Sequence, residues 1–257
     1  MATTELDIPR LLAETPVSRV EHHETISSTN DRARELAPSL GREEAALIVA
    51  DQQTAGRGRG ANRWWTAPGS LACSLVFDPA TLGILRASFP LISLATALAI
   101  VDATRPLLPG QELGMHWPND VFAAGRKLSG ILVEVLPDGR HVIGVGLNIN
   151  HRSEETPAEL EHRATSLATL SEREHSRTDL LVELLGALWP NFAQLATAPV
   201  EIARRANAAC LQHDRTLTIE SGHNRVTGRC VGIADDGALL LETDAGPQKF
   251  YSGALIH

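Results

Sequence analysis

The chain has 257 residues, of which 43% are apolar and 21% charged, and its formal net charge is −8 at pH 7. These values describe a globular chain long enough for one large domain, or for one domain and a small second one. The acidic balance argues against broad nucleic-acid binding. Cys73, Cys210 and Cys230 are far apart and show no metal-type spacing, which is typical of reduced structural thiols.

The N-terminal segment and the longest apolar stretch both argue against membrane insertion. Residues 1–7 lack a basic region followed by an apolar core, so we do not expect a signal peptide. The stretch from Leu91 to Val101 is too short to span a bilayer and contains Ser93 and Thr96, so it predicts a buried core helix. We therefore expect a cytoplasmic protein with no membrane partner.

The first half of the chain mixes predicted strands and helices irregularly. A strand over 17–26 ends at the polar residues 27–30, which we expect to cap a helix over 31–37. The next predicted elements are strands at 46–51 and 71–78, a helix at 88–104, a strand before Trp117, and a hairpin with arms at 127–135 and 141–148 around a turn at 137–139. This irregular order favours an α+β fold with a mixed sheet.

The end of the chain changes character after two predicted helices at 178–196 and 200–209. Beyond Cys210, short strands are separated by turn residues, at 217–219, 226–233, 238–242 and 249–251. Short, evenly spaced strands of this kind predict a small all-β barrel of about five strands. We therefore expect a catalytic domain over residues 1–210 and a small β domain over residues 211–257.

A glycine- and arginine-rich segment follows the strand at 46–51. In residues 53–65, here called the Gly-Arg loop, Arg57 and Arg59 alternate with three glycines. Exposed backbone N–H groups interleaved with guanidinium groups suit a phosphate, and the tryptophans Trp64 and Trp65 provide a flat face for a heteroaromatic base. The alternative is a flexible, solvated basic loop.

Two further segments carry polar residues at strand ends. Pro118 disfavours helix and is expected to keep its segment extended, so that Asn119 and Asp120 project from a strand end. Lys127 heads an apolar strand, and Gly130 leaves room there for a ligand. Ordinary readings remain open, since Asn119 and Asp120 also suit a turn, and Lys127 also suits a strand-end cation that extends to water.

The chain contains only two lysines, Lys127 and Lys249, against 21 arginines. A lysine that survives in such a chain is a candidate for a task that the planar guanidinium cannot perform. Further on, Gly144 and Gly146 remove side chains from one face of a strand, and Asn148 offers a donor and an acceptor that suit the edge of adenine. A β-bulge with a capping asparagine explains these last residues equally well.

Five motifs in order resemble the biotin protein ligase family. They are Ser28-Thr29-Asn30, the GRGR run from Gly56 to Arg59, Trp117-Pro118-Asn119-Asp120, the RKLSGIL strand from Arg126 to Leu132, and the GVGLNIN strand from Gly144 to Asn150. The resemblance covers roughly residues 20–210, and the tail resembles that family's small SH3-like C-terminal domain. It implies ATP-dependent activation of biotin to biotinyl-5′-AMP and transfer to a lysine of a biotin carboxyl carrier protein.

The resemblance also implies roles for individual residues. The implied catalytic residues are Arg57, Arg59, Asp120 and Lys127. The implied biotin-binding residues are Ser28, Thr29, Asn30, Gln53, Gly56, Arg57, Gly58, Arg59, Lys127 and Gly130. The implied ATP-binding residues are Arg57, Arg59, Trp64, Asn119, Asp120, Lys127 and Asn148. Mg²⁺ is expected with ATP, and no residue is assigned as its ligand.

The chain departs from the family pattern after the GRGR run, where Ala61, Asn62 and Arg63 precede Trp64. Arg63 either replaces the family's second loop arginine or that role is lost. A lipoate or octanoate ligase or transferase of the same fold is the alternative function, although the chain lacks the RRxSGGG-like loop of those enzymes. The roughly 27 residues before Ser28 are too few for a winged helix, so we expect no DNA binding. A homodimer remains open.

Overall fold

A seven-stranded mixed sheet forms the body of the protein. The computed structural model describes residues 6–152, 156–222 and 224–256. Along the sheet the strands lie in the order β1 (Arg19–Ile26), β2 (Ala46–Gln53), β3 (Leu71–Phe77), β7 (His141–Leu147), β6 (Arg126–Val135), β5 (Asp120–Ala123) and β4 (Leu113–His116). β1 and β2 run parallel, and every other neighbouring pair is antiparallel.

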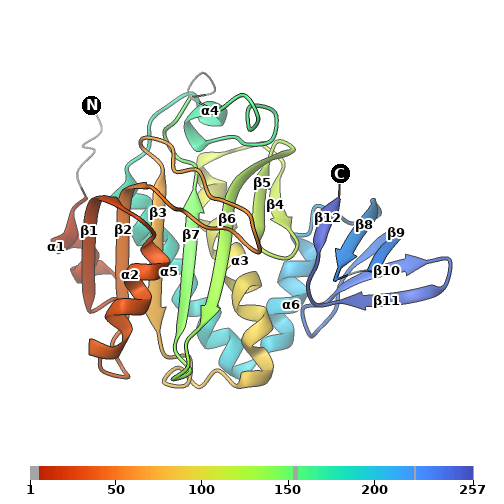
Figure 1. Ribbon diagram of the computed structural model, residues 1–257, viewed down its shortest axis with the longest axis horizontal. Coiled ribbons are helices and arrows are strands. Elements are labelled where there is room, and N and C mark those ends of the chain that lie inside the picture. The colour runs from red at the N-terminus through yellow and green to blue at the C-terminus, as the bar shows by residue number, and fades with distance from the viewer. Residues whose placement is uncertain (1–5, 153–155, 223, 257) are drawn as a thin grey trace.

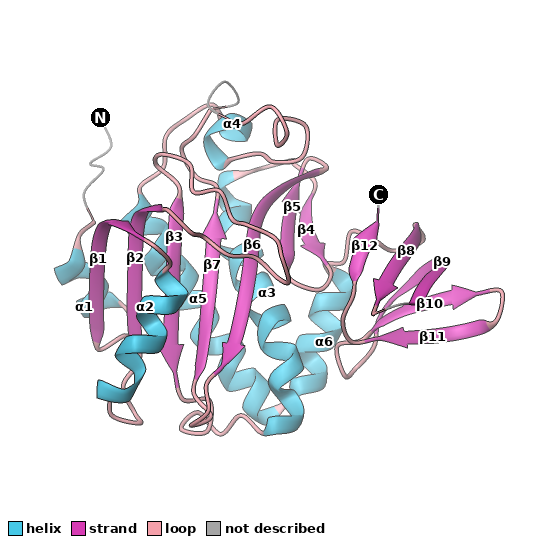
Figure 2. Cartoon of the chain, in the orientation of Figure 1, coloured by secondary structure: helices cyan, strands magenta, loops and turns pink. Residues whose placement is uncertain are grey.

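Helices cover both faces of this sheet (Figures 1 and 2). The helices are α1 (Ile8–Glu14), α2 (Thr29–Leu36), α3 (Ile92–Thr104), α4 (Leu167–Ser171), α5 (Arg177–Thr197) and α6 (Pro199–Ala208), with short 3₁₀ turns at Ala37–Ser39, Arg86–Leu91 and Arg105–Leu107. α2 lies in front of the sheet, whereas α3 and α5 lie behind it. In β2, Leu47 and Val49 belong to the large core behind the sheet, and Ile48 belongs to the smaller core under α2. Burial on both faces explains why this strand is continuously apolar.

The apolar helix predicted near 88–104 is a core helix, as expected, but it is longer than expected. α3 and its flanking 3₁₀ turns form one helical segment, Arg86–Leu107, of 22 residues. That length suffices for a bilayer, so the sequence argument from length was wrong. The segment is nevertheless a core helix, because 72% of its most apolar 18-residue stretch is buried inside the protein.

The C-terminal strands form a separate antiparallel sheet. Their order is β11 (Gly246–Phe250), β10 (Leu239–Thr243), β9 (Asn224–Ile233), β8 (Thr216–Ser221) and β12 (Ala254–Ile256). The α+β fold with a small all-β tail is therefore confirmed. The boundary at residue 210 remains a prediction, although the chain does pass from α6 to β8 at this point.

The two sheets are joined through β4 and the turn that follows it. The backbone N–H of Met115 donates to the carbonyl of Ala209 at 2.7 Å, and the N–H of Leu211 donates to the carbonyl of Met115 at 2.9 Å. The indole Nε1–H of the buried Trp117 donates to the carbonyl of Gly237, in the turn between β9 and β10, at 3.0 Å. The joint is thus a set of backbone hydrogen bonds, with one aromatic side chain inserted between the sheets.

Several local predictions were incomplete or wrong. The sequence analysis assigned no element to the short segments α1, α4, β5 and β12, in which few residues carry a periodic signal. Residues 117–119 form the turn between β4 and β5 and are not extended. α2 begins at Thr29, two residues before the predicted start, and the side chain of its N-cap residue, Ser28, makes no capping hydrogen bond. The remaining predicted strands and helices agree with the structure to within a few residues.

Replacing Trp117 with phenylalanine should weaken the joint between the two sheets. The change leaves the buried carbonyl of Gly237 without its donor and creates a small cavity, so we expect a loss of about 1–3 kcal/mol in the free energy of unfolding. Urea unfolding measures this loss. Trp189→Phe on α5, where the indole is half-buried, is the matched control, and equal losses in the two variants would contradict the assignment.

Candidate functional site

The predicted site residues meet at one cavity of about 1250 Å³ on the α2 side of the main sheet. Its walls come from the start of α2, the Gly-Arg loop, the turn at 117–120, and strands β6 and β7. Every residue that the sequence analysis assigned to biotin or ATP lines this cavity except Gly56. Gly56 packs behind the wall, where a side chain would meet the carbonyl oxygen of Trp64 at 2.6 Å.

Glycines form the floor of the cavity. Gly130 on β6 and Gly146 on β7 are cross-strand partners. The indole of Trp64 lies over both, since a methyl group at 146 would overlap its ring and one at 130 would come within 3.1 Å of it. A methyl group at Gly144 would likewise overlap the amide oxygen of Asn30. The prediction that Gly144 and Gly146 remove side chains from one face of their strand is confirmed. The space that they leave is occupied by Asn30 and Trp64 of this same chain.

Lys127 forms an ion pair that the sequence analysis did not predict. Its Nζ lies 2.7 Å from Oδ2 of Asp120 and 5.8 Å from the ring centre of Trp64. The other carboxylate oxygen of Asp120, Oδ1, is buried and has no hydrogen-bond partner. Burial raises the pKa of Asp120, and the ammonium group of Lys127 opposes that shift. Lys127 and Asp120 are therefore a coupled pair, with one carboxylate oxygen left to accept a further bond.

Arg59 reaches across the cavity to the turn at 117–120. Its Nη1 donates to Oδ1 of Asn119 at 3.1 Å, and Nδ2 of Asn119 donates to the carbonyl of Ile131 on β6 at 2.8 Å. Burial lowers the pKa of Arg59, and the nearby Asp120 opposes that effect. Among the described residues no carboxylate is in hydrogen-bond contact with Arg59, and a half-buried guanidinium of this kind is well suited to an anionic ligand.

The start of α2 supplies a polar corner to the cavity. Ser28, Thr29 and Asn30 are all buried. Oε1 of Gln53 accepts hydrogen bonds from the backbone N–H of Thr29 at 2.9 Å and from its hydroxyl at 3.2 Å. Hydroxyl and amide groups converge here, which suits a neutral polar ligand with both donors and acceptors.

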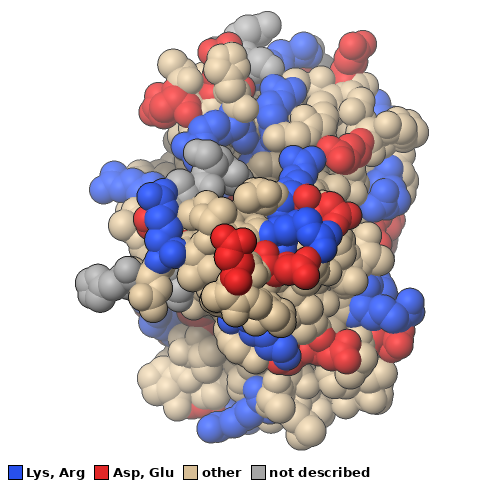
Figure 3. All heavy atoms as spheres, turned by 90° about the vertical axis from the view of Figure 1, so that its right-hand side faces the viewer, with Lys and Arg blue, Asp and Glu red and all other residues tan. Residues whose placement is uncertain are grey.

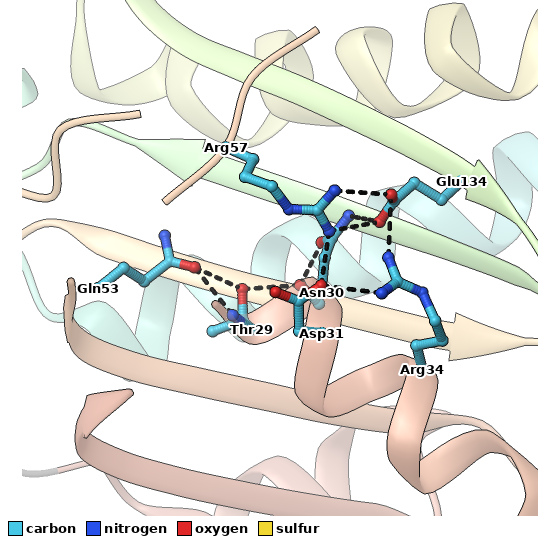
Figure 4. A network of polar contacts seen from close by, with 8 residues as sticks. Thr29, Asn30, Asp31, Arg34, Gln53, Arg57 and Glu134 are labelled. Atoms are coloured by element: carbon cyan, nitrogen blue, oxygen red, sulfur yellow. Dashed lines mark hydrogen bonds and ion pairs between the residues drawn. The ribbon is translucent and has the colours of Figure 1, made fainter. Parts of the chain in front are cut away.

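Arg57 makes contacts different from those predicted for it. The sequence analysis placed its guanidinium on a phosphate, but the structure pairs it with Glu134 on β6 and Asp31 on α2 (Figure 4). Neither carboxylate was identified from the sequence. The available signal was Glu134, an acidic residue in the apolar second half of its strand and four residues beyond Gly130, which puts both on the same face.

Two other residues have simpler positions. Asn148 is buried, and its Nδ2 lies 3.5 Å from the carbonyl of Lys127. Arg63 lines the cavity and is joined to Arg57 by an isolated antiparallel bridge across the Gly-Arg loop.

In the described part of the chain, no group of three or more His, Cys, Asp or Glu residues is arranged to hold a metal ion. The three cysteines are free and buried, as expected.

The fold and this cavity define the class of biotin and lipoate protein ligases. The sequence profile of the biotin/lipoate A/B protein ligase family matches residues 23–150, and that of the biotin protein ligase C-terminal domain matches residues 213–257. The chain belongs to the biotin protein ligase family, whose members are ATP-dependent ligases.

Individual relatives agree with this assignment. The chain is 36% identical to the biotin--[acetyl-CoA-carboxylase] ligase of Paracoccus denitrificans, over 86% of this chain and 93% of the relative. It is 32% identical to the enzyme of the same name from Mycobacterium tuberculosis, over 90% of this chain and 85% of the relative. Among solved structures, the biotin protein ligase from Aquifex aeolicus in complex with biotin and ATP is 26% identical, with a TM-score of 0.80, over 93% of this chain and 98% of that one.

A side chain added to the cavity floor should displace Trp64. The methyl group of Gly146→Ala would overlap the indole, so we expect the ring to leave its seat and the tryptophan emission to move to longer wavelength. Fluorescence of the ligand-free protein measures this change. Gly186→Ala on α5 has open space around the added methyl and is the matched control. Identical spectra for Gly146→Ala and the unmodified protein would show that Trp64 does not rest on the glycines.

Proposed function

We propose that this chain activates biotin with ATP to form biotinyl-5′-AMP, and that it transfers the biotinyl group to a lysine of a biotin carboxyl carrier domain. The observation that carries the proposal is the position of Lys127. Its ammonium group lies inside a glycine-floored cavity, beside Asp120 and under Trp64. The five family motifs line that same cavity, and the chain belongs to the biotin protein ligase family.

The first step joins two anions. A carboxylate oxygen of biotin attacks the α-phosphorus of ATP, a new phosphorus–oxygen bond forms, and the bond to the β-phosphate breaks to release pyrophosphate. Negative charge gathers on the phosphate oxygens as the reactants meet, and fixed cations stabilise it. Lys127 and Arg59 supply these cations, because both line the cavity and no carboxylate of residues 6–152, 156–222 or 224–256 is in hydrogen-bond contact with Arg59.

The rest of the cavity divides between the two substrates. The polar corner formed by Ser28, Thr29, Asn30 and Gln53 binds the ureido ring of biotin, with backbone N–H groups of the Gly-Arg loop around it. Trp64 stacks on the adenine, while Asn148 and Asn119 contribute polar contacts to the nucleotide. Closure of the loop over the adenylate excludes water and protects the intermediate from hydrolysis.

The donor set fits a Mg²⁺ ion that enters with the nucleotide. Proteins often hold Mg²⁺ through one or two carboxylates together with substrate phosphates. Oδ1 of Asp120 is buried, has no partner and belongs to a residue that lines the cavity. When bound, the ion would reduce the charge on the triphosphate, and Asp120 is the residue that would hold it.

The second step requires a protein lysine at the same cavity. A free lysine has a pKa of about 10.4 and is mostly protonated at neutral pH, so its amine needs a group that orients it or accepts its proton. Oδ1 of Asp120 suits this role as well, once pyrophosphate has left. The amine then attacks the acyl carbon, and AMP leaves.

The shape of the cavity supports a protein acceptor. Its volume of about 1250 Å³ exceeds the ~300–1,000 Å³ typical of a small-molecule site. The cavity extends past Lys127 to Arg163, to Arg215 and to residues 252–255 beside β12. In the described part of the chain neither of these arginines has an ion-pair partner. An acidic lysine-bearing turn of a carrier domain would fit between the two sheets.

The other expected properties remain predictions. On the outer face of the C-terminal sheet, acidic and basic side chains are interspersed (Figure 3). Arg229 there pairs with Asp214 at 2.7 Å and with Glu242 at 2.6 Å. The expected absence of DNA binding remains a prediction. Cytoplasmic location and a homodimer likewise stay predictions.

Biotin-dependent exchange of labelled pyrophosphate into ATP tests the first step. We expect exchange with biotin and none with lipoate. Lys127→Ala should abolish exchange, because it removes a charge-assisted contact of about 1.5–3 kcal/mol. The protein should stay folded, because the residue lies at the beginning of a strand. Lys249→Ala is the matched control, since Lys249 is exposed on β11 and pairs with Asp236. Exchange at the unmodified rate in a folded Lys127→Ala variant would remove Lys127 from the mechanism.

Arg59→Gly should release the adenylate prematurely. The change removes the contact between the Gly-Arg loop and Asn119, and one charged contact of about 1.5–3 kcal/mol corresponds to roughly ten- to a hundredfold faster release. Adenylate synthesis should survive in part because Lys127 remains. The measurement is biotin attached to an unrelated lysine-rich protein during incubation with ATP and biotin. Labelling no higher than for the unmodified enzyme, with synthesis intact, would contradict this role of Arg59.

A further inference from the structure

Asp31, Arg34, Arg57 and Glu134 form a closed ring of ion pairs beside the cavity, here called the charge ring (Figure 4). Arg57 contacts Oδ1 of Asp31 at 2.8 Å and both carboxylate oxygens of Glu134 at 3.1 and 3.2 Å. Arg34 contacts the same Oδ1 of Asp31 at 3.0 Å and Oε1 of Glu134 at 3.1 Å. Each guanidinium therefore bridges both carboxylates, and the ring carries no net charge.

The charge ring joins three separate parts of the chain. Asp31 and Arg34 belong to α2, Glu134 belongs to β6, and Arg57 is the one member on the Gly-Arg loop. Isolated surface ion pairs contribute little, but two-pronged guanidinium–carboxylate contacts within a network are stronger. Burial disfavours the charged form of Glu134, yet hydrogen bonds from Asn30 and Arg57 outweigh it and lower the pKa of Glu134. The carboxylate is consequently charged at neutral pH.

The charge ring continues into the polar corner of the cavity. Oε2 of Glu134 accepts a hydrogen bond from Nδ2 of Asn30 at 2.7 Å. The hydroxyl of Ser74 lies 2.6 Å from Oδ1 of Asn30 and 2.8 Å from the hydroxyl of Thr29. Thr29 in turn binds Gln53. The side chains expected to hold the ligand are thus fixed by the same network that holds Arg57.

The same network reaches both ends of the Gly-Arg loop. Gln53 opens the loop, and its Nε2 donates to the hydroxyl of Thr66, just beyond the loop, at 3.3 Å. Within the loop, backbone bonds from Gly58 to Asn62 and from Trp64 to Gly56 make a short hairpin. Arg57 is on the first arm of this hairpin, so a restraint on its side chain restrains the whole loop.

A direct contact between Arg57 and a phosphate competes with this arrangement. Both terminal nitrogens of Arg57 already donate to carboxylates, and two adjacent negative charges weaken its attraction for an anion. Arg59 lines the same cavity, and in the part of the chain that the structure describes it has no carboxylate in hydrogen-bond contact. The two arginines of the GRGR run therefore have different surroundings, in spite of their symmetrical sequence.

We propose that the charge ring is a latch that holds the Gly-Arg loop over the α2 end of the cavity, with Arg57 as a positioning residue. The purpose of the latch, which is to keep the ligand enclosed, depends on the proposed function. Its effect on the loop is measurable without any ligand. Asp31, Arg34 and Glu134 do not line the cavity, so changes to them remove no direct ligand contact.

Limited trypsin digestion of the ligand-free, full-length protein tests the latch. Trypsin cleaves after Arg59 and Arg63 only when the loop detaches, so the cleavage rate follows the open population. Glu134→Gln keeps the size of the side chain and removes its charge, and we expect cleavage in the loop to be about tenfold faster. Asp31→Asn, which removes the charge of the other carboxylate that Arg57 contacts, should accelerate cleavage in the same direction. Mass spectrometry identifies the cut sites.

Glu35→Gln is the matched control. Glu35 is also on α2, is 68% exposed and pairs with Arg32 at 3.3 Å, outside the charge ring. We expect its cleavage rate to stay within about twofold of the unmodified protein. Equal cleavage rates in Glu134→Gln, Asp31→Asn and the unmodified protein would overturn the latch. This result is independent of pyrophosphate exchange, so failure of the latch and failure of the proposed function are distinguishable.

A double-mutant cycle separates positioning from a direct phosphate contact. If Arg57 acts through Glu134, then Arg57→Ala combined with Glu134→Gln should cleave no faster than Arg57→Ala alone, because both changes remove one shared contact. In pyrophosphate exchange, both single variants should raise the KM for biotin by a similar factor and leave kcat within about threefold. A loss of kcat in Arg57→Ala that Glu134→Gln does not share would assign Arg57 to the phosphate and refute the proposal.

Discussion

The close approach of the Gly-Arg loop to strands β6 and β7 is the constraint on which the site depends. An indole can lie flat on a sheet only where the strands beneath it lack side chains, and the cross-strand glycines Gly130 and Gly146 provide that surface. Trp64 rests there and lies near the ammonium group of Lys127. The same clearance at Gly144 admits Asn30 from α2. Three elements far apart in the sequence therefore meet at one position of the sheet.

The cationic residues around the cavity differ in what neutralises them. Lys127 is paired with one carboxylate, Asp120, and Arg57 is enclosed by two. Arg59 is half-buried against the amide of Asn119, and Arg163 and Arg215 lie farther out along the cavity. A positive charge binds an anion more strongly when no carboxylate already compensates it. This difference in neighbouring carboxylates is the basis for the different roles proposed for Arg57 and Arg59.

The joint between the sheets gives the cavity its second wall. Trp117 inserts between the two sheets and bonds to the turn at Gly237, while the backbone of Met115 pairs with both sides of Cys210. These contacts hold the C-terminal sheet against the edge strand β4. The cavity therefore has a second wall on the side of the C-terminal sheet, where residues 252–255 line it. One motif, Trp117 to Asp120, contributes to both the joint and the lining of the cavity.

The sequence by itself determined the family, most of the strands and helices, the hairpin turn at 137–139, and the clearing of one strand face by Gly144 and Gly146. These features are local, because they depend on the periodicity and the order of residues within short segments. Only the tertiary structure decided which charges meet. Arg57 and Glu134 are 77 residues apart, and Trp117 and Gly237 are 120 apart. Their contacts follow from strand order and sheet packing, and no local pattern encodes them. For the same reason the sequence assigned Arg57 and Arg59 equivalent roles, whereas the fold gives the first two carboxylate partners and the second an amide.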